Sequence, residues 1–244
     1  MTEPAWSAVD EFFESHLLEG DPILEACLRS SEEADLPSIQ VSPSQGKLLH
    51  LLAKAISARR ILEVGTLGGY SATWLARALP ADGRLVSLEL QPKHADVARA
   101  NLARAGLEKK VEIRVGPALE SLPKLLAEGV GPFDLIFLDA DKPNTRAYLD
   151  WALKLSRPGT LIVIDNVVRK GELANAASTD PNVRGMREVV EALATERRVD
   201  ATGIQTVGMK GYDGFLLIRV EEAPEVPTGR SPASSRSPRP RRAA

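Results

Sequence analysis

The sequence has 244 residues, 26% of them charged and 43% hydrophobic, with a formal net charge of −2. This composition is typical of one well-buried globular domain, and the near-neutral charge gives no indication of a nucleic-acid or anionic-membrane partner. The only cysteine, Cys27, excludes an intramolecular disulfide and fits a reducing compartment. We see neither a secretory signal pattern nor an apolar run of membrane-spanning length, so we expect a cytoplasmic protein.

The first forty residues predict a helical cover of the main domain. Apolar side chains recur at helical spacing over residues 5–18 and, more weakly, over residues 22–34. Trp6, Phe12 and Phe13 belong to this pattern, and we interpret them as core or subunit-contact residues rather than substrate contacts. A third helix is expected over residues 44–57, because Pro43 precedes it at a position where helices tolerate proline.

Short apolar runs then alternate with helical segments. Strands are expected at residues 60–64, 84–90, 111–115, 133–138 and 160–164, with helices at 71–79, 92–105, 118–128, 145–155 and 183–197. Such alternation is typical of a mostly parallel sheet with helices on both faces. Residues 199–207 and 215–220 indicate two further strands joined directly, which requires an antiparallel hairpin at the end of the sheet. The predicted fold class is therefore α/β, with a seven-stranded sheet in a domain spanning residues 41–222.

Residues 223–244 form a tail rich in Pro, Ser and Arg. From Gly229 onward the chain has five arginines, no acid, and no leucine, isoleucine, valine or aromatic residue. A segment without apolar side chains to bury cannot offset the entropy lost on ordering, so we expect disorder. An arm that binds phosphates, a membrane surface or a nucleic acid is the alternative.

A glycine-rich turn follows the first expected strand. The residues VGTLGGYS let the backbone turn tightly beside a ligand and open a helix with free N–H groups, although such a turn can also simply connect a strand to a helix. The pattern differs from the dinucleotide G-x-G-x-x-G. Glu89 ends the next strand, where an acid can accept both hydroxyls of a ribose or can merely be solvated. The small residues Gly116, Pro117 and Ala118 would suit an adenine ring, and Glu63 inside a buried strand must be paired.

Two later strands end on acidic residues. The runs LIFLDADK and LIVIDN finish on Asp139 and on Asp165 followed by Asn166. Neighbouring strands lie about 4.8 Å apart, so these carboxylates would repel one another unless a cation or a proton lies between them. An all-oxygen donor set without His or Cys suits Mg²⁺ rather than zinc. Two helix-capping aspartates are the alternative, and Lys142 is either a general base or a surface lysine.

Taken together, these segments resemble the metal-dependent O-methyltransferases that use S-adenosylmethionine (SAM), the group of catechol O-methyltransferase, caffeoyl-CoA O-methyltransferase and their small bacterial relatives. The resemblance covers roughly residues 39–220 and is carried by VSPSQGKLL, ILEVGTLGGYSA, LVSLEL, VGPALESLP, FDLIFLDADK, LIVIDNV and GYDGFLLIR. It implies a Rossmann-like class I methyltransferase fold and a homodimer. It also implies methyl transfer to one hydroxyl of a small-molecule vicinal aromatic diol, with Mg²⁺ favoured over Mn²⁺ or Ca²⁺.

The resemblance implies roles for single residues. Cation ligands would be Asp139, Asp165 and Asn166, and the catalytic base would be Lys142. The expected cofactor contacts, with Thr66 and Pro117 added from the two loops, are Val41, Glu63, Gly65, Thr66, Tyr70, Ser71, Glu89, Pro117, Ala118, Asp139 and Asp141. Compared with catechol O-methyltransferase, Ala140 replaces a histidine and Asp141 replaces an aromatic residue of the substrate pocket, so a catecholamine specificity does not carry over.

Two other functions remain open. A metal-independent methyltransferase acting on nitrogen often carries an Asn/Asp-Pro-Pro-aromatic loop after the fourth strand, where this chain has DADK. A non-catalytic SAM-binding protein would be favoured by loss of Asp139, Lys142 or Asp165, all of which are present. The sequence does not identify the acceptor, whose specificity we expect in residues 1–40 and 169–184.

Overall fold

The computed structural model describes residues 3–18 and 20–222. The strands are β1 (Arg60–Val64), β2 (Arg84–Glu89), β3 (Val111–Val115), β4 (Phe133–Leu138), β5 (Ser156–Asp165), β6 (Val199–Gly208) and β7 (Gly211–Val220). The helices are α1 (Glu3–Leu17), α2 (Pro22–Glu33), α3 (Pro43–Ala55), α4 (Tyr70–Ala78), α5 (Pro92–Arg104), α6 (Ala118–Ala127), α7 (Thr145–Lys154) and α8 (Pro181–Leu193). Two 3-10 helices, η1 (Lys142–Asn144) and η2 (Arg169–Ala174), were not expected from the sequence.

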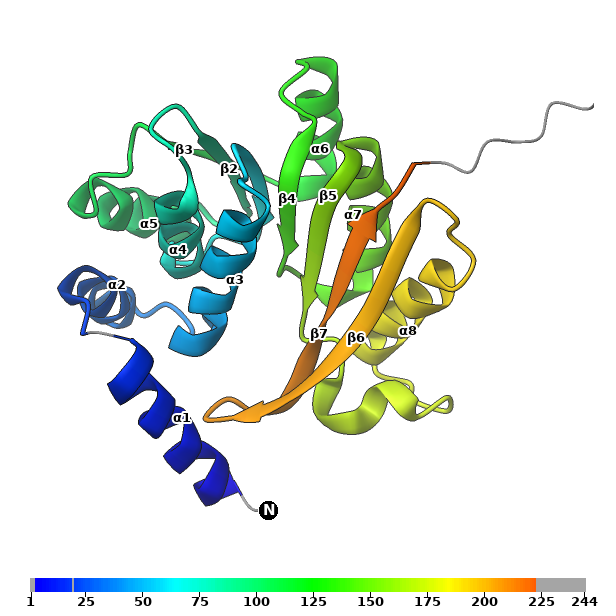
Figure 1. The fold of residues 1–244 in the computed structure, drawn as a ribbon, viewed down its shortest axis with the longest axis horizontal. Coiled ribbons are helices and arrows are strands. Elements are labelled where there is room, and N and C mark those ends of the chain that lie inside the picture. Colours follow the sequence, from blue (N-terminus) through cyan, green and yellow to red (C-terminus); the bar gives the residue numbers. More distant parts are fainter. Residues whose placement is uncertain (1–2, 19, 223–244) are drawn as a thin grey trace, which may run out of the picture.

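The strands form one sheet in the order β3-β2-β1-β4-β5-β7-β6 (Figure 1). The pairs among β1 to β5 are parallel, whereas β7 is antiparallel to both β5 and β6. The predicted parallel sheet with a C-terminal antiparallel hairpin is therefore confirmed. The strand order reverses between β1 and β4, and ligands of such sheets bind outside the carboxyl ends at this switch point.

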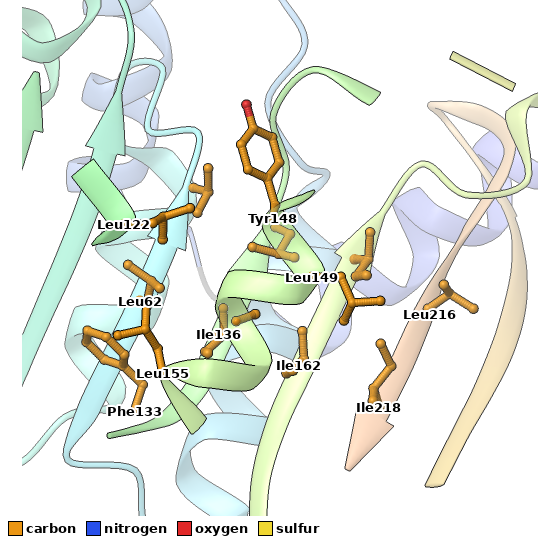
Figure 2. Packing of buried hydrophobic residues seen from close by; sticks show 14 of the residues in the cluster. Leu62, Leu122, Phe133, Ile136, Tyr148, Leu149, Leu155, Ile162, Leu216 and Ile218 are labelled. Atoms are coloured by element: carbon orange, nitrogen blue, oxygen red, sulfur yellow. The ribbon is translucent and has the colours of Figure 1, made fainter. Parts of the chain in front are cut away.

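The central strands bury side chains on both faces because helices cover each face, whereas β6 is exposed along most of its length. In β1, Ile61 belongs to the cluster shared with α2, α3 and α4, and its neighbour Leu62 belongs to the cluster shared with α6, α7 and α8. Figure 2 shows the second cluster, in which Leu62, Ile136 and Ile162 from three strands lie beside Leu149 of α7. Burial on both faces explains the continuous apolar runs of residues 135–138 in β4 and 161–164 in β5.

Several element boundaries differ from the sequence-based expectation. Strand β5 begins at Ser156, because the segment before Thr160 continues beside β4 after a shift in register. The hairpin turn contains only Met209 and Lys210, so β7 starts at Gly211 rather than after a longer loop. Helix α8 ends at Leu193, earlier than predicted.

Helix α1 lies apart from the sheet, next to the tip of the β6–β7 hairpin (Figure 1). Asp10 accepts a hydrogen bond from the Met209 backbone N–H at 2.7 Å, which ties the helix to that tip. Phe12 and Phe13 are 59% and 47% exposed. The expectation that these two residues could lie in the core is therefore wrong, and their contact with a second subunit stays a prediction.

Helix α2 is packed into the main body of the protein. Leu24 and Cys27 share a buried cluster with residues of α3 and α4. The division of one domain into a helical cover, residues 1–40, and a main part, residues 41–222, stays a prediction. The predicted disordered tail, residues 223–244, lies outside the described residues. Within residues 3–18 and 20–222, no helix has both the length and the apolar character needed to cross a membrane.

Candidate active site

A cavity of about 640 Å³ lies along the carboxyl edge of the sheet. Its walls come from the loops that follow β1 to β5 and from the segment before α3. The predicted site residues that line it are Val41, Gly65, Thr66, Tyr70, Ser71, Glu89, Pro117, Ala118, Asp139, Asp141, Lys142 and Asn166. Two predicted residues, Glu63 and Asp165, are buried and are not among the lining residues. The fold thus brings residues from separate loops into a single site.

The glycines of the turn after β1 allow neighbouring segments to approach closely, and they also leave space for a ligand. Gly65 has φ 103°, and a Cβ there would lie 2.0 Å from the backbone oxygen of Asp139. A Cβ on Gly68 would lie 2.1 Å from Ser31 Oγ of α2, and Gly69 has φ 84°. The turn therefore requires glycine because β4 and α2 approach its backbone closely.

Two buried side chains that do not line the cavity donate hydrogen bonds to the backbone carbonyl of Gly68. Asn101 of α5, 2% exposed, donates from Nδ2 to this oxygen at 2.8 Å. The Cys27 thiol donates to the same oxygen at 3.4 Å, and burial raises its pKa to about 12, which keeps it protonated. Asn101 Oδ1 accepts in turn from Ser30 Oγ and Arg104 Nη1, both at 2.6 Å. Sequence reasoning missed Asn101, because one polar residue on an amphipathic helix indicates a solvated position.

Glu89 is held mainly by backbone N–H groups. Its Oε2 accepts from Thr66 N at 3.1 Å and Leu67 N at 2.8 Å, and its Oε1 accepts from Gln91 N at 2.9 Å. His94 Nδ1 lies 3.4 Å from Oε1, and His94 also lines the cavity. An ionised carboxylate offers about four acceptor positions, so three N–H groups leave room for one more donor. Glu89 therefore has acceptor capacity left on the side of the cavity, and its contact with both ribose hydroxyls stays a prediction.

Glu63 is fully buried beneath the cavity. Its two carboxylate oxygens accept from Ser71 Oγ at 2.6 Å and from Ser87 Oγ at 2.5 Å. Burial raises the pKa of Glu63 to about 7, against the opposing effect of these two hydrogen bonds. Ser71 lines the cavity, so Glu63 would act on a ligand through that hydroxyl. Its direct contact with a cofactor stays a prediction.

The two aspartates that end β4 and β5 are neighbours, as predicted. These strands are parallel, and Leu138 lies opposite Ile164, so Asp139 and Asp165 follow side by side. Burial, followed by the negative charge of Asp139, raises the pKa of Asp165 to about 7. Lys142 Nζ donates to Asp139 Oδ1 at 2.9 Å, and its charge partly offsets the rise at Asp165.

This acidic pair fits a divalent cation. Asn166, with φ 56°, lines the cavity and donates its backbone N–H to Asp165 Oδ1 at 2.8 Å. The Gln45 side chain is a further hydrogen-bond partner of Asp165, and the Lys142 ammonium lies beside the two carboxylates. Carboxylate and amide oxygens are the ligands that Mg²⁺ prefers. Within the described part of the chain, no group of three or more His, Cys, Asp or Glu side chains could hold a metal. A cation at this position would therefore rest on two acids, one amide, and water or substrate.

Tyr148, which we did not predict as a site residue from the sequence, lines the cavity near this pair. Tyr148 OH donates to Asp141 Oδ1 at 2.5 Å, and Asn144 Nδ2 donates to Asp141 Oδ2 at 2.5 Å. The Tyr148 ring packs in the core while its hydroxyl points away from the cluster (Figure 2). Burial and the adjacent carboxylate hold the pKa of Tyr148 well above its usual range. An aromatic residue at helical spacing indicates core packing. Tyr148 has this role, and its hydroxyl also positions Asp141.

Comparison with known proteins agrees with this geometry. A family model described as O-methyltransferase matches residues 14–220. The chain is 51% identical over 221 residues to the catechol O-methyltransferase of Niastella koreensis, covering 91% of this chain and 100% of that protein. It is 53% identical over 212 residues to the catechol O-methyltransferase of Mycobacterium tuberculosis, covering 87% and 94% of the two chains.

A solved structure supports the same assignment. The O-methyltransferase from Bacillus cereus in complex with SAH has a TM-score of 0.89 and 53% identity, covering 90% of this chain and 100% of that chain. The family inferred from the sequence motifs is confirmed by these matches. Because the family model spans most of the sequence and the relatives match almost end to end, this chain belongs to the O-methyltransferase family.

Proposed function

We propose that this protein moves the methyl group of SAM to one hydroxyl of a vicinal aromatic diol, with a divalent cation at Asp139, Asp165 and Asn166. The observation that carries the proposal is the acidic pair at the ends of adjacent strands, beside Lys142. Support for the donor comes from the Bacillus cereus relative bound to SAH, the demethylated product of SAM. Support for the acceptor comes from two relatives named catechol O-methyltransferase.

The loops after β1, β2 and β3 would bind the methyl donor. Glu89, held in place by three backbone N–H groups, would accept the ribose hydroxyls, and the loop at Pro117 and Ala118 offers a small-residue surface for adenine. Asp141, held by Tyr148 and Asn144, would pair with the cationic amine of the methionine part. Val41 and Tyr70 would enclose the remainder of that part.

The residues after β4 and β5 would activate the acceptor. A phenol with a pKa near 10 is about 99.9% protonated at neutral pH, and in that form it is a poor nucleophile. When bound, the cation would supply positive charge that favours the ionised oxygen and would accept both oxygens of a vicinal diol. Asp139, Asp165 and Asn166 would hold the cation.

Lys142, in its neutral form, would take the proton from the attacking hydroxyl. The new C–O bond forms as the S–C bond breaks, so the products are a methyl ether, SAH and one proton held at Lys142 Nζ. Lys142 is only 7% exposed, which keeps bulk water from competing for this proton.

A second copy of the chain would cover the exposed face of α1. Val9, Phe12, Phe13 and Leu17 are 52%, 59%, 47% and 69% exposed and recur at helical spacing. This face supports the homodimer implied by the family resemblance. Light scattering should give twice the chain mass for the wild type and a lower mass for Phe12→Ser, whereas a wild-type monomer at micromolar concentration would contradict the homodimer.

The test of the proposed function is methyl transfer from labelled SAM to a panel of phenols. With Mg²⁺ present, we expect label on catechol and almost none on a monophenol, because only the diol offers two oxygens to the cation. A chelator should abolish transfer, and added Mg²⁺ should restore it. Transfer to a nitrogen acceptor with the diols inert, or catechol turnover unaffected by the chelator, would contradict the proposal.

A further inference from the structure

The cavity extends beyond the acidic pair to a cationic side chain. Arg169, the first residue of η2, is half-buried and lines the cavity together with Asn166, Lys142 and Asn182. Within residues 3–18 and 20–222, no Asp or Glu forms a salt bridge with Arg169. A guanidinium without a protein counter-ion, facing a ligand cavity, is available to a ligand.

The backbone at Arg169 is held in an unfavourable conformation. Arg169 and Lys170 have φ 53° and φ 58°, in the left-handed region that residues with a Cβ rarely adopt. Asp213 of β7 holds this turn, because its Oδ1 accepts from Val168 N and Arg169 N, both at 3.0 Å. Strained backbone that the surrounding structure maintains is concentrated at functional sites. In this turn, residue 169 faces the cavity, whereas Lys170 is exposed and does not line it.

The charges at this end favour an anion. A divalent cation would balance Asp139 and Asp165, which leaves Arg169 as surplus positive charge beside the acceptor. Asp180 is the nearby acid whose pKa responds to Arg169, but that pKa is lowered chiefly by hydrogen bonds from Asn182. Asp180 is exposed at the start of α8 and does not line the cavity.

We propose that Arg169 is a specificity-determining residue that selects vicinal aromatic diols carrying a carboxylate over neutral or cationic diols. This inference rests on the proposed function. A guanidinium presents a planar fork of N–H donors that matches a carboxylate in a two-point hydrogen bond. The same charge repels the ammonium of a catecholamine.

The experiment compares kcat/KM of the full-length protein, with Mg²⁺, for three diols that share one ring: 3,4-dihydroxybenzoate, catechol and dopamine. We expect the wild type to prefer the benzoate. Arg169→Gln should lower kcat/KM for the benzoate by about 10- to 100-fold, the range for a lost charged hydrogen bond, mainly through KM, and should leave catechol within about threefold. The matched control is Lys170→Gln, which removes the same charge from the adjacent left-handed residue and should change neither value.

Charge reversal and direct binding complete the test. Arg169→Glu should make dopamine better than the benzoate. An equal loss for all three diols in Arg169→Gln, or a wild type that methylates catechol without preferring the benzoate, would overturn the inference and leave the proposed function intact.

Calorimetric binding of 3,4-dihydroxybenzoate to the SAH-loaded protein does not require turnover. If no diol is methylated but the benzoate binds about tenfold more weakly to Arg169→Gln, the proposed function fails and the role of Arg169 in anion recognition stands. If the benzoate binds both proteins equally, that role is excluded.

Discussion

The two ends of the cavity hold their carboxylates in opposite ways. At the end formed by the loops after β1 and β2, Glu89 accepts three backbone N–H groups and Glu63 accepts two hydroxyls. At the other end, Asp139 and Asp165 lie side by side next to the Lys142 ammonium, and Asp165 also accepts hydrogen bonds from Asn166 N and the Gln45 side chain. Neutral donors built into the fold bind both carboxyl groups of the first end, whereas at the second end two adjacent carboxyl groups act directly on one another beside that ammonium. This difference agrees with the proposal that one end is ready for its ligand and that the other binds a cation.

The largest expected effect is at the second end. Lys142→Gln removes the proposed base and should lower the rate of methyl transfer to catechol by about 10²- to 10⁴-fold. SAH affinity, measured by calorimetry, should stay within about threefold, because Lys142 does not contact the Glu89 end. Lys154→Gln, an exposed lysine of α7, is the control and should behave like the wild type. If Lys142→Gln lowered SAH affinity as much as the rate, the claim that the two ends bind different ligands would be contradicted.

Glu63, which is buried at the first end, is expected to affect the free energy of unfolding. Its pKa of about 7 in the folded protein, against 4.5 for an ordinary glutamate, means that ionising it costs on the order of 3 kcal/mol. The folded state binds more protons than the unfolded state between these two values, so this cost grows as pH rises through that window and is complete above about pH 7. Glu63→Gln should therefore be more stable than the wild type at pH 8.

Urea unfolding at pH 4 and pH 8 checks this prediction. The unfolding free energies of wild type and variant should differ little at pH 4, where residue 63 is neutral in both proteins. At pH 8 the variant should be more stable by up to the cost of ionising Glu63, on the order of 3 kcal/mol. SAH binding reports separately whether the variant keeps the Ser71 contact. A constant difference in unfolding free energy at both pH values would contradict the buried, raised pKa.

A smaller effect is expected from the residues behind the glycine turn. Asn101→Asp removes the N–H donor to the Gly68 carbonyl and should weaken SAH binding about tenfold, within the 1–3 kcal/mol cost of leaving a buried acceptor unpaired. KM for SAM should rise while kcat changes by less than about twofold. Ser30→Ala keeps the contact with Gly68 and is the matched control. A fall in kcat with SAH affinity preserved would assign Asn101 to another role.

The smallest effect is expected from removing the C-terminal tail. Among the described residues, none beyond Asn182 lines the cavity, so a chain ending at Glu222 should keep kcat/KM within about twofold. The comparison is made with the full-length protein at two salt concentrations, because an arm that binds an anionic partner would respond to salt. A tenfold loss of activity on truncation would assign the tail to substrate binding or subunit contact.

The parts of the fold that followed from the sequence are those where local pattern and tertiary environment agree. Apolar runs buried on both faces predicted the parallel strands, and the acids that end β4 and β5 could be brought together because parallel strands share an edge. The β5 start was missed because Arg-Pro-Gly favours a loop, although neighbouring pairing continues the strand past it. For the phenylalanines of α1 the sequence could not separate core from subunit contact, because periodicity identifies an apolar face and not what covers it.

Residues whose roles depend on distant partners were not predictable. Asn101 matters because the Gly68 carbonyl points at it from 33 positions away. Tyr148 combines a core ring with a hydroxyl that reaches Asp141, and only the first role leaves a periodic pattern. Arg169 lay in a loop expected to control specificity, but its orientation depends on the two hydrogen bonds that Asp213 of β7 accepts from Val168 N and Arg169 N.

The contrast between the two ends is tested most directly by one pair of measurements on protein stripped of divalent ions. SAH affinity and catechol turnover are measured on the same sample before and after Mg²⁺ is restored. We expect SAH affinity to stay within about threefold throughout, and turnover to be at least about 100-fold lower until Mg²⁺ returns, because only the acidic pair requires the ion. Full turnover without divalent ions, or SAH binding that is lost together with the ion, would contradict the account.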